Sequence, residues 1–241
     1  MNLIILDKSE LENQFFPSAD RRYRHIRRIL KSQAGDRLRG GVLSGPRGII
    51  TITSIEPDAI HYTFEADTEP LAPLPVYLLC GLPRPQQVKR ILRDGTAMGV
   101  SAIWFPHSVL GEKSYFHSPI WADDHWMGLV IDGLEQSGNT IPPDIRIFDG
   151  LQTSLAALPP NITILTLDIP ASTPPLLSLL DTVPAMTPTA LVIGSERGWT
   201  DSERSFLRQA GSRFGHLGPR ILRSDTACIA AVSLASARLY S

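Results

Sequence analysis

The C-terminal part of the chain constrains the fold most strongly, because two strand–loop–helix patterns follow one another there. The apolar run Thr189 to Ile193 predicts a buried strand, residues 194–199 a glycine-bearing loop, and Thr200 the start of a helix. Thr200 and Glu203 form an S/T-x-x-E capping box, in which each side chain satisfies a backbone donor at the helix start. Gly211 is the expected end of that helix.

A second pattern of the same kind ends the chain. Residues 214–217 are expected to form a short strand, and Ser224 or Asp225 to cap a final helix. Alanines spaced four residues apart share one face of this helix and let a neighbouring backbone approach closely. These alanines are Ala227, Ala231 and Ala235. An ordinary, tightly packed C-terminal helix also accounts for that spacing.

These two stretches resemble the signature of the SPOUT methyltransferases that modify uridine N3 of small-subunit ribosomal RNA. The family reads IGPEGG and LGxRxLRxETA where this chain reads IGSERG, residues 193–198, and LGPRILRSDTA, residues 217–227. Asp225 replaces the glutamate of the second motif, while Ser195 and Arg197 replace a proline and a glycine of the first. The resemblance implies a C-terminal trefoil knot whose loops bind S-adenosylmethionine. Composition alone cannot suggest a knot, because true knots are rare.

Composition and charge predict a soluble, cytoplasmic protein. The chain has 241 residues, 43% of them hydrophobic, and a formal net charge of −1, so it can hold one large domain or two smaller ones. We find neither a signal peptide nor an apolar run approaching the ~20 residues of a membrane span. Cys80 and Cys228 lie in apolar surroundings and are expected to be reduced packing residues. No metal site is expected.

A cluster of basic residues lies near the N-terminus. Residues 21–39 contain eight Lys or Arg residues and one acidic residue. Apolar residues at roughly helical spacing predict that one face packs while the arginines project from the others; they are Tyr23, Ile26, Ile29 and Leu30. Such a basic face is often only a solvated surface, but guanidinium groups also pair with phosphate and flat side chains stack on bases. The expected RNA-binding residues are Arg21, Arg22, Arg24, His25, Arg27 and Arg28.

The layout from His25 to Asp36 resembles the opening of the same family, whose small N-terminal β-barrel is PUA-like and binds RNA. Short strands are expected at residues 38–43, 48–55 and 60–65. Three prolines between Asp67 and Val76 place a domain boundary near Pro73. We therefore predict a PUA-like RNA-binding domain over residues 1–70 and a SPOUT methyltransferase domain over residues 74–241.

Beyond the boundary, strands alternate with helices, which predicts an α/β fold with a parallel sheet. Strands are expected at residues 76–80, 101–106, 144–148 and 162–167, and helices at 86–98 and 118–137, the second opened by Ser118 and Pro119. The segment LRDGTAMGVS, residues 92–101, resembles the family's IQKATELGVS, but Asp94 replaces a lysine and Ala97 a glutamate. Asn139 stands where the family has an arginine. These departures leave the exact RNA target open.

The resemblance assigns the cofactor to three loops of the knot. The residues expected to contact S-adenosylmethionine are Leu167, Asp168, Ile193, Gly194, Ser195, Glu196, Gly198, Leu217, Gly218, Ile221, Leu222, Arg223, Thr226 and Ala227. Uracil N3 must lose its proton, so a cation that stabilises the anion is useful, and Arg223 is the first candidate. Glu196 is a second catalytic candidate for polar contact, and its alternative role is to serve the start of the following helix.

Arg197 is expected to alter the loop that follows residue 193. If the backbone there needs the positive φ of the family's glycine, an arginine adopts it at a cost of about 1 kcal/mol. The loop then either keeps the family conformation, with Arg197 reaching an RNA phosphate, or shifts and reshapes the base pocket.

Three functional classes remain open. The first is an S-adenosylmethionine-dependent methyltransferase of ribosomal RNA or the small ribosomal subunit, expected to be a homodimer through its C-terminal domain. The second is an RNA-binding protein of the same fold with an altered target or lost catalysis. The third is a dehydrogenase-type nucleotide-binding enzyme. The sequence does not favour it, because no G-x-G-x-x-G follows any expected strand. Calorimetry with S-adenosylmethionine and NAD separates the third class from the others, and methyl transfer to ribosomal subunits separates the first two.

Overall fold

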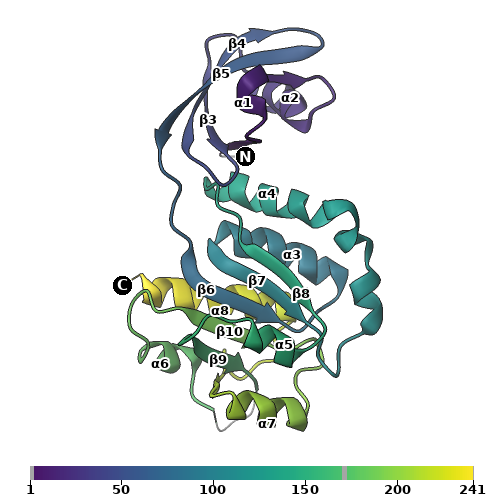
Figure 1. Cartoon of the computed structure of the whole chain (residues 1–241), viewed down its shortest axis with the longest axis vertical. Helices are drawn as coiled ribbons and strands as arrows, with labels where there is room; N and C mark the ends of the chain where they lie inside the picture. Colours follow the sequence, from purple (N-terminus) through teal and green to yellow (C-terminus); the bar gives the residue numbers. More distant parts are fainter. Residues whose placement is uncertain (1–2, 170–172, 241) are drawn as a thin grey trace. The chain divides into compact units, whose positions relative to one another are not determined.

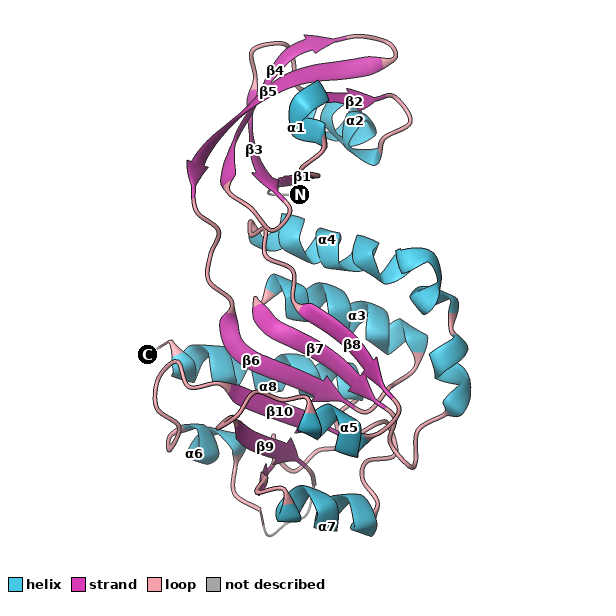
Figure 2. Cartoon of the chain, viewed as in Figure 1, coloured by secondary structure: helices cyan, strands magenta, loops and turns pink. Residues whose placement is uncertain are grey.

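The computed structural model describes residues 3–169 and 173–240 (Figure 1). The chain forms two compact units, of which unit 1 comprises Met1–Ala72 with Leu134–Pro142, and unit 2 comprises Pro73–Gly133 with Pro143–Ser241. Unit 1 is therefore built from two separate stretches of the chain. The expected α/β class is confirmed: one unit holds a parallel sheet and the other a curled sheet (Figure 2).

The described part of unit 2 contains a six-stranded parallel sheet of order β11-β9-β10-β6-β7-β8. Its strands are β6 (Leu74–Cys80), β7 (Val100–Pro106), β8 (Asp144–Phe148), β9 (Thr163–Leu167), β10 (Thr189–Ile193) and β11 (Arg213–Gly215). Strands of a sheet that is covered on both faces read as apolar runs, and all five residues of β10 are buried. The alternation of strands and helices thus predicted the sheet correctly.

Helices cover both faces of this sheet. They are α3 (Pro85–Ala97), α4 (His125–Ser137), α5 (Leu151–Ala156), α6 (Leu176–Leu180), α7 (Asp201–Gln209) and α8 (Ser224–Leu239), with 3₁₀ segments η2 (Lys113–His117) and η3 (Pro119–Asp124). Successive strand residues point to opposite faces. Leu78 accordingly packs in the core that contains residues of α3 and α8, and Leu79 in the core that contains residues of α5 and α7.

Two predictions about helices in unit 2 need correction. Ser118 caps a helix with Pro119 in its first turn, as expected, but that helix is the 3₁₀ segment η3, so residues 118–137 do not form one α-helix. The Trp121 indole donates to the carbonyl of Tyr115 at 3.2 Å, which holds this segment against η2. The final helix has Arg223 at its N-cap position with no side-chain cap. Ser224 and Asp225 already belong to the helix, and their side chains bind Gly194 and Arg90 instead.

Unit 1 contains a curled five-stranded sheet of order β1-β3-β4-β5-β2 (Figure 2). The strands are β1 (Ile4–Leu6), β2 (Phe15–Pro17), β3 (Arg37–Val42), β4 (Arg47–Ile55) and β5 (Ala59–Thr68), accompanied by helices α1 (Glu10–Asn13) and α2 (Arg21–His25) and the π-helix η1 (Ile26–Leu30). Strand β1 pairs with β3 in parallel, and the other neighbours pair antiparallel. These strands place a small apolar core around Phe16, Ile52 and Tyr62.

The prediction that four apolar residues of the basic segment pack on one face is correct for two of them. Tyr23 and Ile26 are buried, but Ile29 and Leu30 are 69% and 41% exposed. The cause is η1, because a π-helix turns less per residue than an α-helix and moves later side chains off the α-helical stripe.

Candidate functional site

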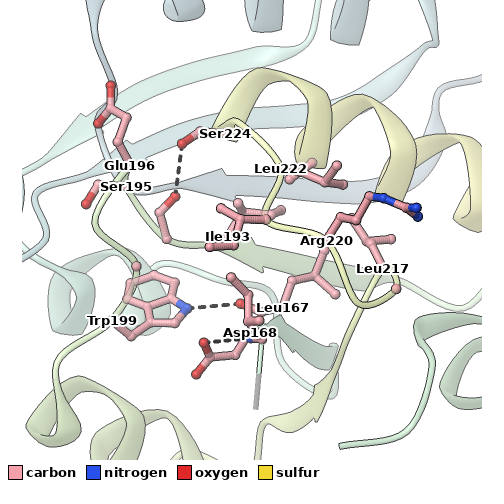
Figure 3. A pocket seen from close by; sticks show the side chains of 16 residues that line it. Leu167, Asp168, Ile193, Ser195, Glu196, Trp199, Leu217, Arg220, Leu222 and Ser224 are labelled. Atoms are coloured by element: carbon pink, nitrogen blue, oxygen red, sulfur yellow. Dashed lines mark hydrogen bonds between the residues drawn. The ribbon is translucent and has the colours of Figure 1, made fainter. Parts of the chain in front are cut away.

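One pocket of unit 2 lies where loops leave the carboxyl ends of β9, β10 and β11, the edge at which open α/β sheets bind ligands (Figure 3). Most of the residues expected to contact a cofactor line it. They are Leu167, Asp168, Ile193, Gly194, Ser195, Glu196, Gly198, Leu217, Gly218, Ile221, Leu222 and Ala227. Three stretches that are distant in the sequence therefore meet at one site.

Two expected residues do not line the pocket, and four others were missed. Arg223 and Thr226 lie outside the lining; the Arg223 side chain is 66% exposed, and its Nε is 3.7 Å from Asp225 Oδ1. The lining residues that were not named as contacts are Ile169, Trp199, Arg220 and Ser224, of which the last two lie within the expected stretch 217–227. Trp199 ends the IGSERGW stretch, so an aromatic residue directly after the loop was the available signal.

The loop after β10 is a tight turn. The Gly198 amide donates to the carbonyl of Ser195 at 2.9 Å, and Gly198 has φ +71°. A Cβ on Gly194 would lie 3.0 Å from the Gly198 Cα, so Gly194 allows close packing of the turn, whereas Gly198 supplies its positive φ. In the described chain, the non-glycine residues with positive φ are Gln14, Lys31, Ser44, Asn161 and Met186. The strain expected at Arg197 is therefore absent, since Gly198 takes the left-handed conformation instead.

Glu196 serves a helix start, but not the expected one. Its Oε1 accepts a hydrogen bond at 2.8 Å from the backbone amide of Arg84, the N-cap residue of α3. The start of α7 is capped by Thr200 and Glu203 in the predicted capping box. The carboxylate of Glu196 thus lies at the positive end of α3, where a negative charge is stabilising.

Asp168 places a buried carboxylate in the pocket wall. Its side chain is 6% exposed, and its Oδ2 lies 2.6 Å from Nε of Arg204 on α7. The hydrogen bond to Asp168 raises the pKa of Arg204. On the wall formed by the start of α8, the Ser224 hydroxyl donates to the carbonyl of Gly194 at 3.5 Å (Figure 3).

The two cysteines are free and buried, as expected for packing residues. A hydrogen bond with Cys228 and burial both raise the pKa of the Cys80 thiol. The described residues contain no group of three His, Cys, Asp or Glu side chains that can hold a metal ion. No helix in the described ranges is long and apolar enough to span a membrane.

The residues expected to bind RNA have different roles in unit 1. Arg22 forms ion pairs with Glu10 and Asp20, and Arg21 bonds Glu135 at 2.9 Å. Burial lowers the pKa of His25. The remaining three are exposed: Arg27 donates to the Tyr23 hydroxyl at 2.7 Å, and Arg24 and Arg28 have no ion-pair partner among the described residues.

The class of this protein is RNA methyltransferase, because residues 70–236, which carry the parallel sheet and its pocket, match the family model described as RNA methyltransferase domain. The ribosomal RNA small subunit methyltransferase E of Treponema pallidum is 32% identical in an alignment covering 100% of this chain and 92% of that protein. The chain belongs to the ribosomal RNA small subunit methyltransferase E family.

Solved structures have the same fold. A probable rRNA-methyltransferase from Porphyromonas gingivalis superimposes with a TM-score of 0.79 at 22% identity, covering 97% of this chain and 96% of that chain. The ribosomal RNA small subunit methyltransferase E from Neisseria gonorrhoeae, bound to S-adenosyl methionine, superimposes with a TM-score of 0.74 at 23% identity, covering 97% and 95%.

Proposed function

We propose that this protein transfers the methyl group of S-adenosylmethionine to N3 of a uridine in small-subunit ribosomal RNA. The observation that carries the proposal is the pocket, whose lining residues come from the stretches 167–169, 193–199 and 217–227 and therefore from both family motifs. The Treponema pallidum relative is named for this ribosomal substrate class, and the Neisseria gonorrhoeae structure holds S-adenosyl methionine.

The lining of the pocket fits a nucleoside-containing ligand. The lining includes three apolar residues that are at least partly exposed to solvent. They are Ile221, Ile169 and Leu222, which are 81%, 53% and 36% exposed. Exposed apolar side chains gathered at one site favour a ligand that covers them. Gly218 adds backbone without a side chain, so a ligand can approach the main chain closely.

Methyl transfer requires that the acceptor be held in line with the methyl group and that water be excluded. S-adenosylmethionine supplies the electrophilic methyl group when bound. We assign stabilisation of the uracil anion to the cations of the segment 217–227, where Arg220 lines the pocket and Arg223 lies outside the lining. Because Glu196 already accepts from Arg84, we assign it a role in holding the loop after β10.

The proposal extends to the rest of the molecule. Unit 1 is a PUA-like domain that binds RNA through Arg24, Arg27 and Arg28, and the protein acts as a cytoplasmic homodimer. The C-terminal segment is a trefoil knot, which is supported by the packing of α8 on α3, α6, β6 and β10. The start of α6 also bonds the chain after β11, since the Leu176 amide donates to the His216 carbonyl at 2.9 Å.

A second candidate function is an RNA-binding protein of this family that has lost catalysis or changed its target. Asn139 favours it, because this residue replaces the family's arginine and its side chain makes hydrogen bonds within unit 1. Its Oδ1 accepts from the Leu71 amide at 3.1 Å, and its Nδ2 donates to the Leu71 carbonyl at 3.2 Å. Asn139 is only 6% exposed, so it cannot replace an RNA-contacting arginine.

A methyl-transfer assay separates the two functions. Small ribosomal subunits that lack the modification are incubated with tritiated S-adenosylmethionine, and the labelled nucleoside is identified after digestion. We expect label at uridine N3. Binding of RNA without label would support the second candidate, and absence of cofactor binding in calorimetry would contradict the assignment of the pocket to S-adenosylmethionine.

A further inference from the structure

Trp199, in the loop before α7, and Arg204, on α7, each contact a residue at the carboxyl end of β9 or directly after it. The Trp199 indole donates to the carbonyl of Leu167 at 3.2 Å (Figure 3), and the Arg204 guanidinium pairs with Asp168. Leu167, Asp168 and Trp199 line the pocket, whereas Arg204 does not. Arg204 therefore reaches the pocket through Asp168.

All three nitrogens of the Arg204 guanidinium contact carboxylates. Nε lies 2.6 Å from Asp168 Oδ2, one terminal nitrogen 3.4 Å from Asp168 Oδ1, and the other 3.1 Å from Asp201 Oδ1. The Asp201 side chain is fully exposed and contributes little, because water screens such pairs. Asp168 and Arg204 are 6% and 27% exposed, so their mutual contact is the stronger one.

Both partners are placed by rigid local structure. The capping box sets the start of α7, with the Thr200 amide donating to Glu203 Oε2 at 2.8 Å, and so positions Arg204 one residue later. Glu203 also accepts from the Val109 amide at 2.9 Å. On the other side, the Asp168 amide donates to the carbonyl of Gly215 at 3.0 Å. The ion pair is thus preorganised and does not depend on two freely moving side chains.

We propose that the Asp168–Arg204 ion pair positions the pocket wall that holds the methyl donor. This inference rests on the proposed function, and Arg204 acts in it as a positioning residue. Without Arg204, the Asp168 carboxylate is a nearly buried charge with no cation, which is unfavourable. Asp168 then turns toward water and moves the adjacent carbonyl and side chain of Leu167 with it.

The test compares single variants in the full-length protein. S-adenosylhomocysteine binding is measured by calorimetry, and KM for S-adenosylmethionine and kcat by methyl transfer. For Arg204→Ala we expect Kd and KM to rise about tenfold, as for loss of one charged hydrogen bond, with kcat within about twofold of the parent. Arg204→Lys should recover part of the affinity. Arg208→Ala is the matched control, because Arg208 lies on the same helix but its guanidinium stacks over the ring of Phe214.

A double-mutant cycle tests whether Arg204 changes cofactor affinity through Asp168. In an Asp168→Asn background, Arg204→Ala should cost little further affinity, since the charge that it balances has gone. An equal loss in both backgrounds would overturn the proposal, as would parental affinity in folded Arg204→Ala. If the alanine variant does not fold, Arg204→Gln, which keeps length and loses charge, carries the same expectation. A parent that does not bind S-adenosylhomocysteine would refute the proposed function itself.

Discussion

The indole nitrogen of Trp199 lies 3.2 Å from the carbonyl oxygen of Leu167 and donates a hydrogen bond that links the loop after β10 to the carboxyl end of β9. The two residues are 3% and 8% exposed. A hydrogen bond in such surroundings is poorly replaced by water, so its loss leaves a buried carbonyl unpaired.

Trp199→Phe removes the donor and keeps an aromatic ring. We expect a loss of about 1–3 kcal/mol in the free energy of unfolding, together with weaker S-adenosylhomocysteine binding, because the unpaired Leu167 carbonyl loosens the loop. Thermal unfolding and calorimetry measure the two effects. Trp104→Phe is the control, since it removes a 2.9 Å indole bond to Asp144 outside the pocket lining. Equal cofactor affinity in both variants would contradict the expectation.

Gly218 has φ +113° in the pocket lining, a conformation that other residues rarely adopt. Gly218→Val should therefore abolish cofactor binding while unit 2 stays folded, as judged by calorimetry and circular dichroism. Gly99→Val matches it, because Gly99 also has positive φ, at +76°, with open space around the site of a Cβ. The control should lose stability but bind the cofactor. Unchanged affinity in folded Gly218→Val would count against the site.

RNA affinity should depend on the exposed arginines of unit 1. Arg24→Ala/Arg28→Ala removes two candidate phosphate contacts, so the log–log slope of affinity against salt should flatten by about two units. Arg22→Ala should change the slope little, because Arg22 is occupied by Glu10 and Asp20. Filter binding over a salt series gives both slopes. An unaltered slope in the double variant would move the RNA site elsewhere.

The Asp20–Arg22 pair should stabilise unit 1 in a pH-dependent way. Burial raises the pKa of Asp20, but hydrogen bonds from Arg22 outweigh it and lower the pKa below the ordinary value of 3.8. The stabilisation is therefore complete above that value and is lost as the pH falls through the lower folded pKa. Arg22→Ala should cost about 3 kcal/mol at pH 7, because it leaves carboxylates unpaired. The difference in melting temperature between Arg22→Ala and the parent should become smaller below about pH 4.

Arg24→Ala is the control for this pH series, because Arg24 is exposed and has no ion-pair partner among the described residues. Its melting temperature should follow that of the parent from pH 7 to pH 3. A constant gap for Arg22→Ala across the series would show that Asp20 is not the responsible group.

Arg197→Gly should leave cofactor affinity unchanged. Arg197 is exposed and has an unstrained backbone, since Gly198 takes the positive φ of the turn. The remaining role for Arg197 is a contact with an RNA phosphate, which methyl transfer on the same RNA tests. A lower rate at unchanged cofactor affinity would support that contact. A gain in cofactor affinity would instead show that Arg197 distorts the turn.

Features set by neighbours in the sequence were predictable. The strand Thr189–Ile193 and the Thr200–Glu203 capping box are in the structure as expected, because apolar runs and helix caps depend on residues a few positions apart. The parallel sheet followed from the alternation of strands and helices. The two motifs, with the residues after β9, then supplied most of the pocket lining, since loops at the carboxyl edge of one sheet converge.

Features that join distant segments were decided only by the tertiary structure. Asp225 looked like a helix cap, but Arg90 binds its carboxylate at 3.0 Å from another helix. The Asp168–Arg204 pair joins residues that are 36 positions apart, and no local pattern marks it. Arg22 was expected to contact RNA, yet folding surrounds it with carboxylates. The sequence does not show whether a charged side chain faces solvent or an ion-pair partner. Only the packing of distant segments brings that partner within hydrogen-bonding distance.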